Sequence, residues 1–342
     1  MSFELTDLCD TVKRNCDIAN ANHAADSTLC VYLLKMREYY RWDQGLRFDA
    51  ALDENSLGRW LRAQEEYWET IETQPFRPLV VDNYRFDPFD AASVNSVLAG
   101  NGLVYSAGFG IRGAAHFFLA ELDSVRECEG VRILIAGREH ARDVSALPAM
   151  SMQDTVFIRR DAIARMLWEK AQEASWHKHD TPMRRALQAY GFESAPYTAI
   201  ARMVNDELET FVQHELGELH AGALLGCEWQ DLLARALGKP AEPLIRAVRD
   251  NIADALTTLP YLLRDFRPAA LHFYFSTLGP LRKSLQPSLI NAYDLWRETQ
   301  QLAQLQQLVE RSAEHWLSVA KQLPLDDWER GTAETFVAAH SL

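Results

Sequence analysis

The stretch from Leu103 to Arg160 differs from the rest of the chain in its residue pattern, and this difference most constrains the fold. It contains short runs rich in β-branched and aromatic residues, separated by glycine or charged turns: LVYSA, HFFLAEL, VRILIAG and TVFIRR. The segment RECEG, from Arg126 to Gly130, has the composition of a hairpin tip. We therefore predict a small, mainly antiparallel β-sheet near residues 103–160, inserted in a multi-helix, mainly α (α+β) protein.

The sequence before this sheet is predicted to be helical, because apolar residues such as Trp60, Leu61, Trp68 and Ile71 recur at helical spacing. The segment Thr73–Asp90 contains three prolines and no period, so we expect it to be a long surface connector. A short helix is expected to follow this connector and to end at the glycines of AGNG, because glycine tolerates the left-handed conformation.

The sequence after the sheet is also predicted to be helical. Thr181 followed by Pro182 has the pattern of a helix N-terminus, and Gly191 closes that helix. The further expected helices are Pro196–Leu225, Trp229–Leu237, Pro243–Leu259, Pro287–Thr299 and Leu302–Leu323. We treat the chain as one unit of 342 residues with sub-regions 1–102, 103–160 and 161–342.

Charge and cysteine usage limit the partners and the compartment. The 48 acidic and 35 basic side chains give a net charge of −13, which disfavours nucleic acid and anionic lipid as partners. No run approaches the roughly 20 apolar residues of a membrane span. The five cysteines are scattered without CxxC spacing, and the N-terminus lacks the pattern of a secretory signal. We expect a cytoplasmic protein, with a protein partner, a homo-oligomer or a small-molecule substrate left open.

The segment QHELGELHAG, from Gln213 to Gly222, carries the main candidate site. At about 100° per residue, Glu207, His214, Glu215 and Glu218 follow one stripe of the predicted helix, whereas His220 falls on the other side. The stripe adjoins an apolar arc that is predicted to face the core, formed by Leu208, Val212, Leu216, Leu219 and Ala223. Acids crowded beside a buried surface need compensation by a bound cation, by basic partners or by protonation.

A divalent metal would supply that compensation directly. His214 and Glu218 are four residues apart on one helix face, and mixed imidazole and carboxylate ligation suits iron, manganese or zinc. Glu207 is a further candidate ligand, and Glu215 is the candidate general base. In the alternative interpretation the stripe is structural and pairs with arginines from a neighbouring helix, for which the candidates are Arg246, Arg249, Arg264 and Arg267.

The next predicted helix contains a second polar stripe of Arg246, Asp250 and Asp254. Asp250 and Asp254 could bring two more carboxylates to the same metal, as in carboxylate sites of helical bundles. The alternative for Arg246 and Asp250 is an ordinary ion pair between residues four apart on a helix. Neighbouring His272 and Tyr274 are more typical of buried residues with satisfied hydrogen bonds.

Two resemblances bear on function. The segments VYLLKMREYYRWDQGL, the GFG turn before HFFLAEL, TVFIRRDAI, HELGELH and RAVRDNIAD resemble an uncharacterised bacterial family without established activity. That resemblance covers most of the chain and implies no catalytic residue. The text HELGE resembles the HExxH motif of zinc peptidases, which implies His214 as a ligand and Glu215 as the base. Glu218 stands where that family requires its second histidine.

Gly108, Gly110 and Gly113 spell GxGxxG directly after a predicted strand, as a dinucleotide-binding loop would. The next segment has the pattern of another strand, and no series of βα units follows, so turn glycines in a meander explain the motif better. Two functions therefore remain open. One is a metal-dependent enzyme, hydrolytic or oxidative, that uses the His214 helix. The other is a noncatalytic interaction or regulatory protein in which the Glu/His network is structural.

Overall fold

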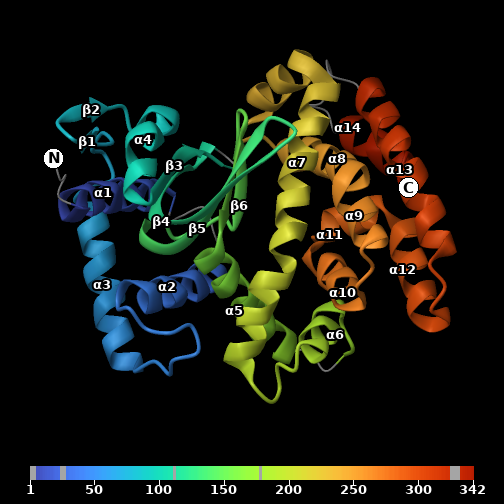
Figure 1. Ribbon diagram of the computed structural model, residues 1–342, viewed down its shortest axis with the longest axis horizontal. Helices are drawn as coiled ribbons and strands as arrows, with labels where there is room; N and C mark the ends of the chain where they lie inside the picture. The colour runs from blue at the N-terminus through green and yellow to red at the C-terminus, as the bar shows by residue number, and fades with distance from the viewer. Residues whose placement is uncertain (1–4, 24–27, 111–112, 177–178, 324–331) are drawn as a thin grey trace. The chain divides into compact units, whose positions relative to one another are not determined.

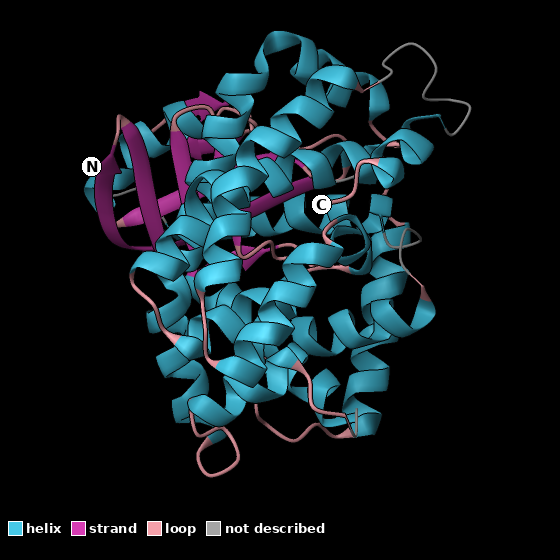
Figure 2. Ribbon diagram, turned by 90° about the vertical axis from the view of Figure 1, so that its right-hand side faces the viewer, coloured by secondary structure: helices cyan, strands magenta, loops and turns pink. Residues whose placement is uncertain are grey.

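The computed structural model describes the chain except for residues 1–4, 24–27, 111–112, 177–178 and 324–331 (Figure 1). Helices make up most of the described chain, and the strands form a two-stranded and a five-stranded sheet, which confirms the predicted mainly helical α+β class (Figure 2). Contacts within the chain divide it into two compact units. The first unit comprises residues 1–148 and 157–169, and the second comprises residues 149–156 and 170–342.

The first unit begins with helices, as predicted. These are α1 (Leu5–His23), α2 (Leu29–Asp43) and α3 (Glu54–Glu69). The segment predicted to be a long surface connector contains an antiparallel hairpin of β1 (Leu79–Val81) and β2 (Tyr84–Phe86). Its turn residues Asp82 and Asn83 both have positive φ, the geometry that favours two-residue hairpin loops.

The short helix predicted after the connector is confirmed as α4 (Ala91–Leu98). Asp90 caps its N-terminus by accepting a hydrogen bond from the backbone N–H of Ser93. A 3₁₀ turn, Ala99–Asn101, continues the helix, and Gly102 ends the segment in the left-handed conformation. The expected glycine stop signal is therefore correct.

The main sheet lies within the predicted region. Its strands are β3 (Leu103–Phe109), β4 (Ala115–Cys128), β5 (Val131–Arg142), β6 (Ala149–Met152) and β7 (Thr155–Arg159), in the order β3-β4-β5-β7-β6. The β3/β4 and β4/β5 pairs are antiparallel, and the turn between β4 and β5 lies at Glu129 and Gly130, as predicted. The sheet as a whole is mixed.

The glycine motif lies at the end of β3. The N–H of Gly110 donates to the carbonyl oxygen of Ala114 at 2.8 Å, and Gly113 has a φ of 73°. The chain then returns antiparallel to β3 as β4, whereas a dinucleotide-binding loop leads into a helix. The prediction of turn glycines within a meander is therefore confirmed.

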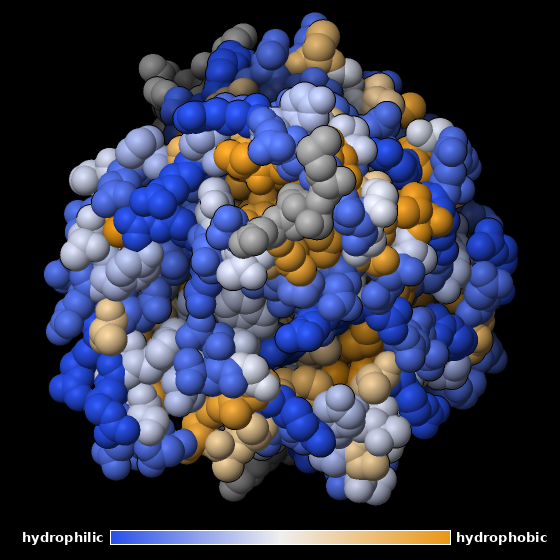
Figure 3. All heavy atoms as spheres, turned by 60° about the vertical axis from the view of Figure 1, so that its left-hand side comes forward, coloured by the Kyte–Doolittle hydropathy of each residue, from blue (hydrophilic) through white to orange (hydrophobic). Residues whose placement is uncertain are grey.

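Hydrophobic clusters among the described residues contribute to the core of the first unit. The larger one packs α1 and α4 against residues of β3 and β4, including Tyr105, Phe117 and Leu119. The smaller one gathers Ile18, Met36, Tyr39, Trp68 and Ile71 from the first helices and the segment that follows them. The surface drawn in Figure 3 is mostly hydrophilic and is interrupted by separate hydrophobic areas.

The remaining helices belong mainly to the second unit. They are α5 (Arg160–Trp176), which spans the division between the units, α6 (Pro182–Ala189), α7 (Pro196–Ala236), α8 (Glu242–Ala253), α9 (Leu259–Arg264), α10 (Pro268–Thr277), α11 (Pro280–Leu285), α12 (Pro287–Thr299), α13 (Ala303–Gln322) and α14 (Thr332–Ala339). Thr181 caps α6, and Gly191 follows that helix with positive φ, as predicted.

Two helical regions of this unit, α7 and the region that begins with α8, contain irregular backbone. Gly226, with φ 75° and ψ −171°, breaks α7 at the point where two separate helices were expected. The single helix predicted for Pro243–Leu259 is wrong, because α8 ends at Ala253 and a π-helical turn, Asp254–Thr258, leads into α9. In a π-turn the backbone hydrogen bonds join residues five apart, whereas in an α-helix they join residues four apart. The π-turn therefore changes which side chains share a helix face.

In the described part of the second unit, one hydrophobic cluster lies around α8 and α13 and another around α10 and α12. Among the helices that the structure describes, none has the length and apolar content that crossing a membrane requires.

Candidate functional site

The candidate site begins with an unusually close approach of two helical segments. In Figure 1, α7 runs beside α8 and α9. A Cβ atom on Gly217 would lie 2.4 Å from the Thr257 hydroxyl and 2.5 Å from the Ala253 carbonyl oxygen. Glycine at this position therefore lets α7 pack against the end of α8 and the π-turn. The Thr257 hydroxyl fastens the contact by donating to the carbonyl of Gln213 at 2.5 Å.

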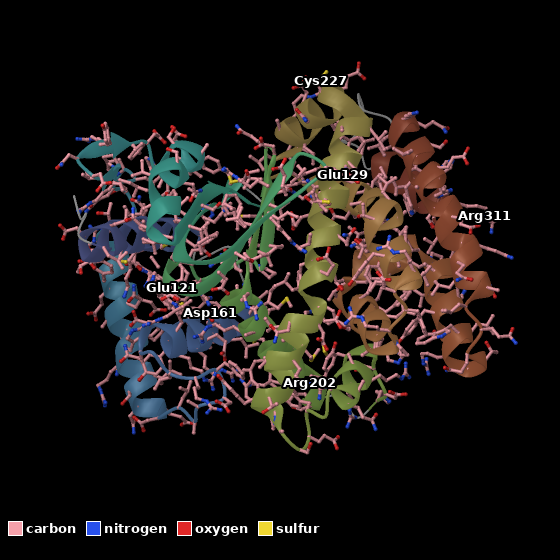
Figure 4. The ribbon with its side chains drawn as sticks, in the orientation of Figure 1. Glu121, Glu129, Asp161, Arg202, Cys227 and Arg311 are labelled. Atoms are coloured by element: carbon pink, nitrogen blue, oxygen red, sulfur yellow. The ribbon has the colours of Figure 1, made fainter. Side chains whose placement is uncertain are left out.

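Three predicted ligands meet at this contact. His214 and Glu218 lie one turn apart on α7, and Asp250 lies on α8. The imidazole Nε2 of His214 is 3.5 Å from Oε1 of Glu218. One donor atom from each of the three residues lies within 4.8 Å of the others, and all three side chains are partly exposed. Figure 4 labels Arg202 and Cys227 toward opposite ends of α7, and His214 and Glu218 lie between these two residues in the sequence.

The predicted ligand Asp254 lies behind the histidine. Its Oδ1 is 2.7 Å from Nδ1 of His214, and the residue is only 2% exposed. Its Oδ2 accepts from the Tyr274 hydroxyl at 2.9 Å and from Arg282 at 2.5 Å. Because a carboxylate only accepts, Nδ1 of His214 carries a proton, and Nε2 is directed toward Glu218.

Basic residues complete a charge network around these acids. Arg249 donates through Nη2 to Glu218 at 2.6 Å and to Asp250 at 3.0 Å. Arg282 donates to Asp254 and also, through Nε, to the side-chain oxygen of Asn251 at 2.8 Å. Three cations, with His214 protonated, therefore face three anionic carboxylates, so this part of the network is balanced without any ligand.

The network shifts the pKa of each member. Burial lowers the pKa of His214, but the adjacent Asp254 and Glu218 outweigh it and raise that pKa well above 6.5. Burial opposes the ionisation of Glu218, yet Arg249 and His214 lower its pKa to about 2. Burial and the negative charge of Glu218 raise the pKa of Asp250. Burial alone would raise the pKa of Asp254, but Arg282 and His214 hold it well below its usual range.

Glu215, the predicted general base, is buried next to this network. It is 6% exposed, and Ser151, which lies on β6 in the same unit, acts to lower its pKa. Burial and the nearby Glu218 carboxylate raise its pKa to about 8, while His214 and Arg249 act in the opposite direction. A carboxyl group with this pKa can take up or release a proton near neutral pH.

Glu207, also predicted to be a ligand, has other partners. Its carboxylate accepts from the Tyr190 hydroxyl at 2.7 Å and from the Thr210 hydroxyl at 3.1 Å. Burial raises its pKa, and these donors together with Arg267 act against that shift. Among the described residues, the cluster of potential ligands comprises only His214, Glu218 and Asp250, so Glu207 is not brought to it.

The helical wheel correctly placed His214 and Glu218 side by side, but it predicted the buried face of α7 less well. Of the predicted apolar arc, Val212 and Leu216 are buried, but Ala223 is exposed, while Glu207 and Glu215 are buried. The reason is that α7 packs against α8, the π-turn, β6 and α10, so more than one of its faces is covered.

The predicted partners of the acids are only partly correct. Arg249 pairs with Glu218, as the structural alternative proposed. Arg246 was expected to pair with Asp250, but it bonds Glu242, one turn toward the N-terminus, at 2.8 Å. Sequence reasoning missed Arg282 and Ser151, because both come from distant segments and no local pattern marks them.

Comparisons with known proteins identify the family and no function. A model described as the family of unknown function DUF6866, N-terminal domain, matches residues 7–159, and its C-terminal domain counterpart matches residues 164–336. No curated protein and no solved structure matches the chain. The two matches together span most of the sequence, consistent with the predicted resemblance to an uncharacterised family. The chain therefore belongs to the DUF6866 family.

Proposed function

We propose that the face between α7 and α8 binds a divalent metal ion and that the protein is a metal-dependent enzyme. The ligands are Nε2 of His214 and carboxylate oxygens of Glu218 and Asp250. The observation that carries this proposal is the 2.7 Å contact between Nδ1 of His214 and the buried Asp254. Metal-binding histidines commonly donate their second ring nitrogen to a carboxylate, which fixes the tautomer and orients the ring.

Metal binding would require a local rearrangement. Metal–ligand bonds of about 2.0 to 2.2 Å place donor atoms closer together than the 4.8 Å limit that encloses this group. The side chains must therefore draw inward, and Arg249 must release the oxygens of Glu218 or Asp250 that it now contacts. His214 must also lose a proton, so metal affinity is expected to rise with pH.

Hydrolysis is the reaction class that we favour. One histidine with two carboxylates differs from the set of two histidines and one carboxylate that is typical of iron oxygenases. A bound metal would activate water, and Glu215 is the residue that we assign as general base or acid. Its place directly after His214 and its pKa of about 8 support that role. We further propose a cytoplasmic location and a small-molecule substrate, in keeping with five free cysteines.

One observation favours the second candidate function, a noncatalytic interaction or regulatory protein. Arg249 and Arg282 already satisfy the carboxylates of Glu218, Asp250 and Asp254. A closed network of this kind can hold α7, α8 and α11 together without a metal. The two candidates predict different metal content, so they can be separated by experiment.

The test is elemental analysis of protein purified without a metal-affinity tag, followed by calorimetric titration with Zn²⁺ and Mn²⁺. His214→Ala and Glu218→Gln should lose stoichiometric binding. Glu207→Gln is the matched control, because this buried carboxylate lies on the same helix with other partners. Binding that is absent from the natural protein, or that persists in both site variants, would remove the metal proposal and favour the structural network.

A further inference from the structure

The first unit contains an open pocket that no part of the proposed metal site uses. Its volume is about 490 Å³, within the range of small-molecule sites. Residues of α1, residues of α3 and Arg77 of the following segment line it, and the lining is more polar than apolar. A ligand of this pocket must therefore be recognised mainly through charged groups and hydrogen bonds.

The most buried charged residue that lines the pocket is Asp17. It lines the pocket although the residue is only 4% exposed. The indole N–H of Trp68 and the side-chain amide of Gln64 both donate to Oδ1, at 3.0 and 3.1 Å. Among the residues that the structure describes, none donates a hydrogen bond to Oδ2. This oxygen therefore keeps its lone pairs for a donor on a ligand.

Burial raises the pKa of Asp17 to about 6, while Trp68 and Lys13 act against that shift. The group is thus mostly ionised at neutral pH and can accept from a cationic donor. Lys13 itself is engaged, because its ammonium contacts Asp43 at 2.5 Å. This leaves the negative charge of Asp17 available to a ligand.

The outer part of the pocket carries positive charge. Asn15 holds the backbone of Arg77 from both sides, accepting from its N–H at 2.7 Å and donating to its carbonyl at 2.8 Å. The guanidinium of Arg77 makes no ion pair within the described parts of the chain. Arg14 donates to the Tyr67 hydroxyl and to Gln74, so the hydroxyl of Tyr67 keeps its own hydrogen for an acceptor on a ligand.

We propose that this pocket binds a small zwitterion of the free α-amino acid type. The ammonium group lies at Asp17, with Asp10 at the rim, and the carboxylate lies at Arg77 and Tyr67. Lys13 also lines the pocket, but Asp43 offsets its charge. The two remaining acids, Asp10 and Asp17, match the two arginines, Arg14 and Arg77, so a ligand without net charge fits better than an anion or a cation. Inorganic phosphate would place two negative charges beside the Asp17 carboxylate and is disfavoured.

The probes are the proteinogenic L-amino acids, titrated one at a time into the full-length protein by calorimetry at neutral pH without added metal. At least one neutral amino acid should bind with one-to-one stoichiometry. Its N-acetyl derivative lacks the ammonium charge, and its amide lacks the carboxylate. Each should bind roughly tenfold to hundredfold more weakly, the expected cost of losing one charged hydrogen-bonded contact.

Two variants assign the binding to this pocket. Asp17→Asn keeps an oxygen for Trp68 and Gln64 but removes the charge, and Arg77→Gln changes an exposed side chain that the core does not need. Both should weaken binding by a similar roughly tenfold or larger factor. The controls are Asp7→Asn on α1 and Arg85→Gln on β2, because neither residue lines the pocket.

Several results would overturn the proposal. These are no binding by any amino acid, equal binding of the N-acetyl derivative, tighter binding of inorganic phosphate, or unchanged affinity in Arg77→Gln. Loss of binding in Arg77→Gln together with full binding in Arg85→Gln would support it, even if Asp17→Asn failed to fold. The metal experiments on His214 have no bearing on these outcomes.

Discussion

Asp254 is the residue on which most of the charge network converges, since His214, Tyr274 and Arg282 all contact its buried carboxylate. Asp254→Asn should reduce the free energy of unfolding by about 3 to 5 kcal/mol, because it removes the buried negative charge that His214 and Arg282 face. Asp265→Asn is the control, since Asp265 forms an exposed pair with Arg264 and should cost about 1 kcal/mol or less. Urea unfolding at neutral pH measures both, and equal losses would contradict the account of the network.

His272 provides a pH prediction that is independent of the proposed metal site. Burial and the cations Arg185 and Arg297 lower its pKa to about 4. The folded protein therefore binds fewer protons here than the unfolded chain does between pH 6.5 and 4. The contribution of His272 to stability is full above pH 6.5 and is lost as the pH falls through about 4, with a slope of up to about 1.4 kcal/mol per pH unit.

His272→Gln removes this titration. The variant should lose less stability than the natural protein when urea unfolding is compared at pH 6.5 and pH 4.5. His315→Gln is the comparison variant, because this half-buried histidine lies on another helix, where it bonds the backbone carbonyl of His340. The same pH dependence in the natural protein and in His272→Gln would show that His272 does not titrate in this way.

At the scale of elements, the close packing of α7 against α8 and the π-turn depends on Gly217. Gly217→Ala places a methyl group against Ala253 and Thr257, so α7 must move away. We expect a loss of about 1 to 3 kcal/mol in unfolding free energy. Gly222→Ala, on the same helix with open space around its Cβ position, should instead be neutral or stabilise by up to about 1 kcal/mol. Similar effects of the two substitutions on thermal unfolding would refute this role.

The sequence predicts elements well where the signal is local. α12 has the predicted bounds, Pro287–Thr299, because proline favours the first turn of a helix. The β1–β2 hairpin was missed because each strand has three residues, too few for a period. The dipeptide Asp82–Asn83 between two apolar or aromatic runs was the signal that could have revealed it. The π-turn after Ala253 has no such local signature. It packs against α7, a contact between segments that a local sequence pattern does not record.

The same distinction applies to the candidate site. His214 and Glu218 could be paired from their spacing on one helix, and Asp250 and Asp254 from their stripe on the next helix. Arg282 could not, since only the folded chain brings α11 to Asp254. Glu207 followed the same stripe as His214 yet bonds Tyr190, because α7 is covered by different elements along its length. A wheel describes directions around one helix and contains no information about its neighbours.

At the scale of the whole molecule, the chain divides into two units, and all proposed metal ligands lie in the second. We therefore expect the stabilisation by metal to be largest in the second unit. A ligand that binds only the folded state stabilises it by about 2.7 kcal/mol when its free concentration is a hundredfold above its Kd. Zn²⁺ or Mn²⁺ should therefore raise the thermal midpoint of the natural protein but not that of Glu218→Gln. Hydrogen exchange should show added protection in α7 and α8, with little change in residues 28–110 of the first unit, because no proposed ligand lies there. Glu207→Gln should retain the metal-dependent protection, and protection spread equally over both units would contradict a site built by α7 and α8.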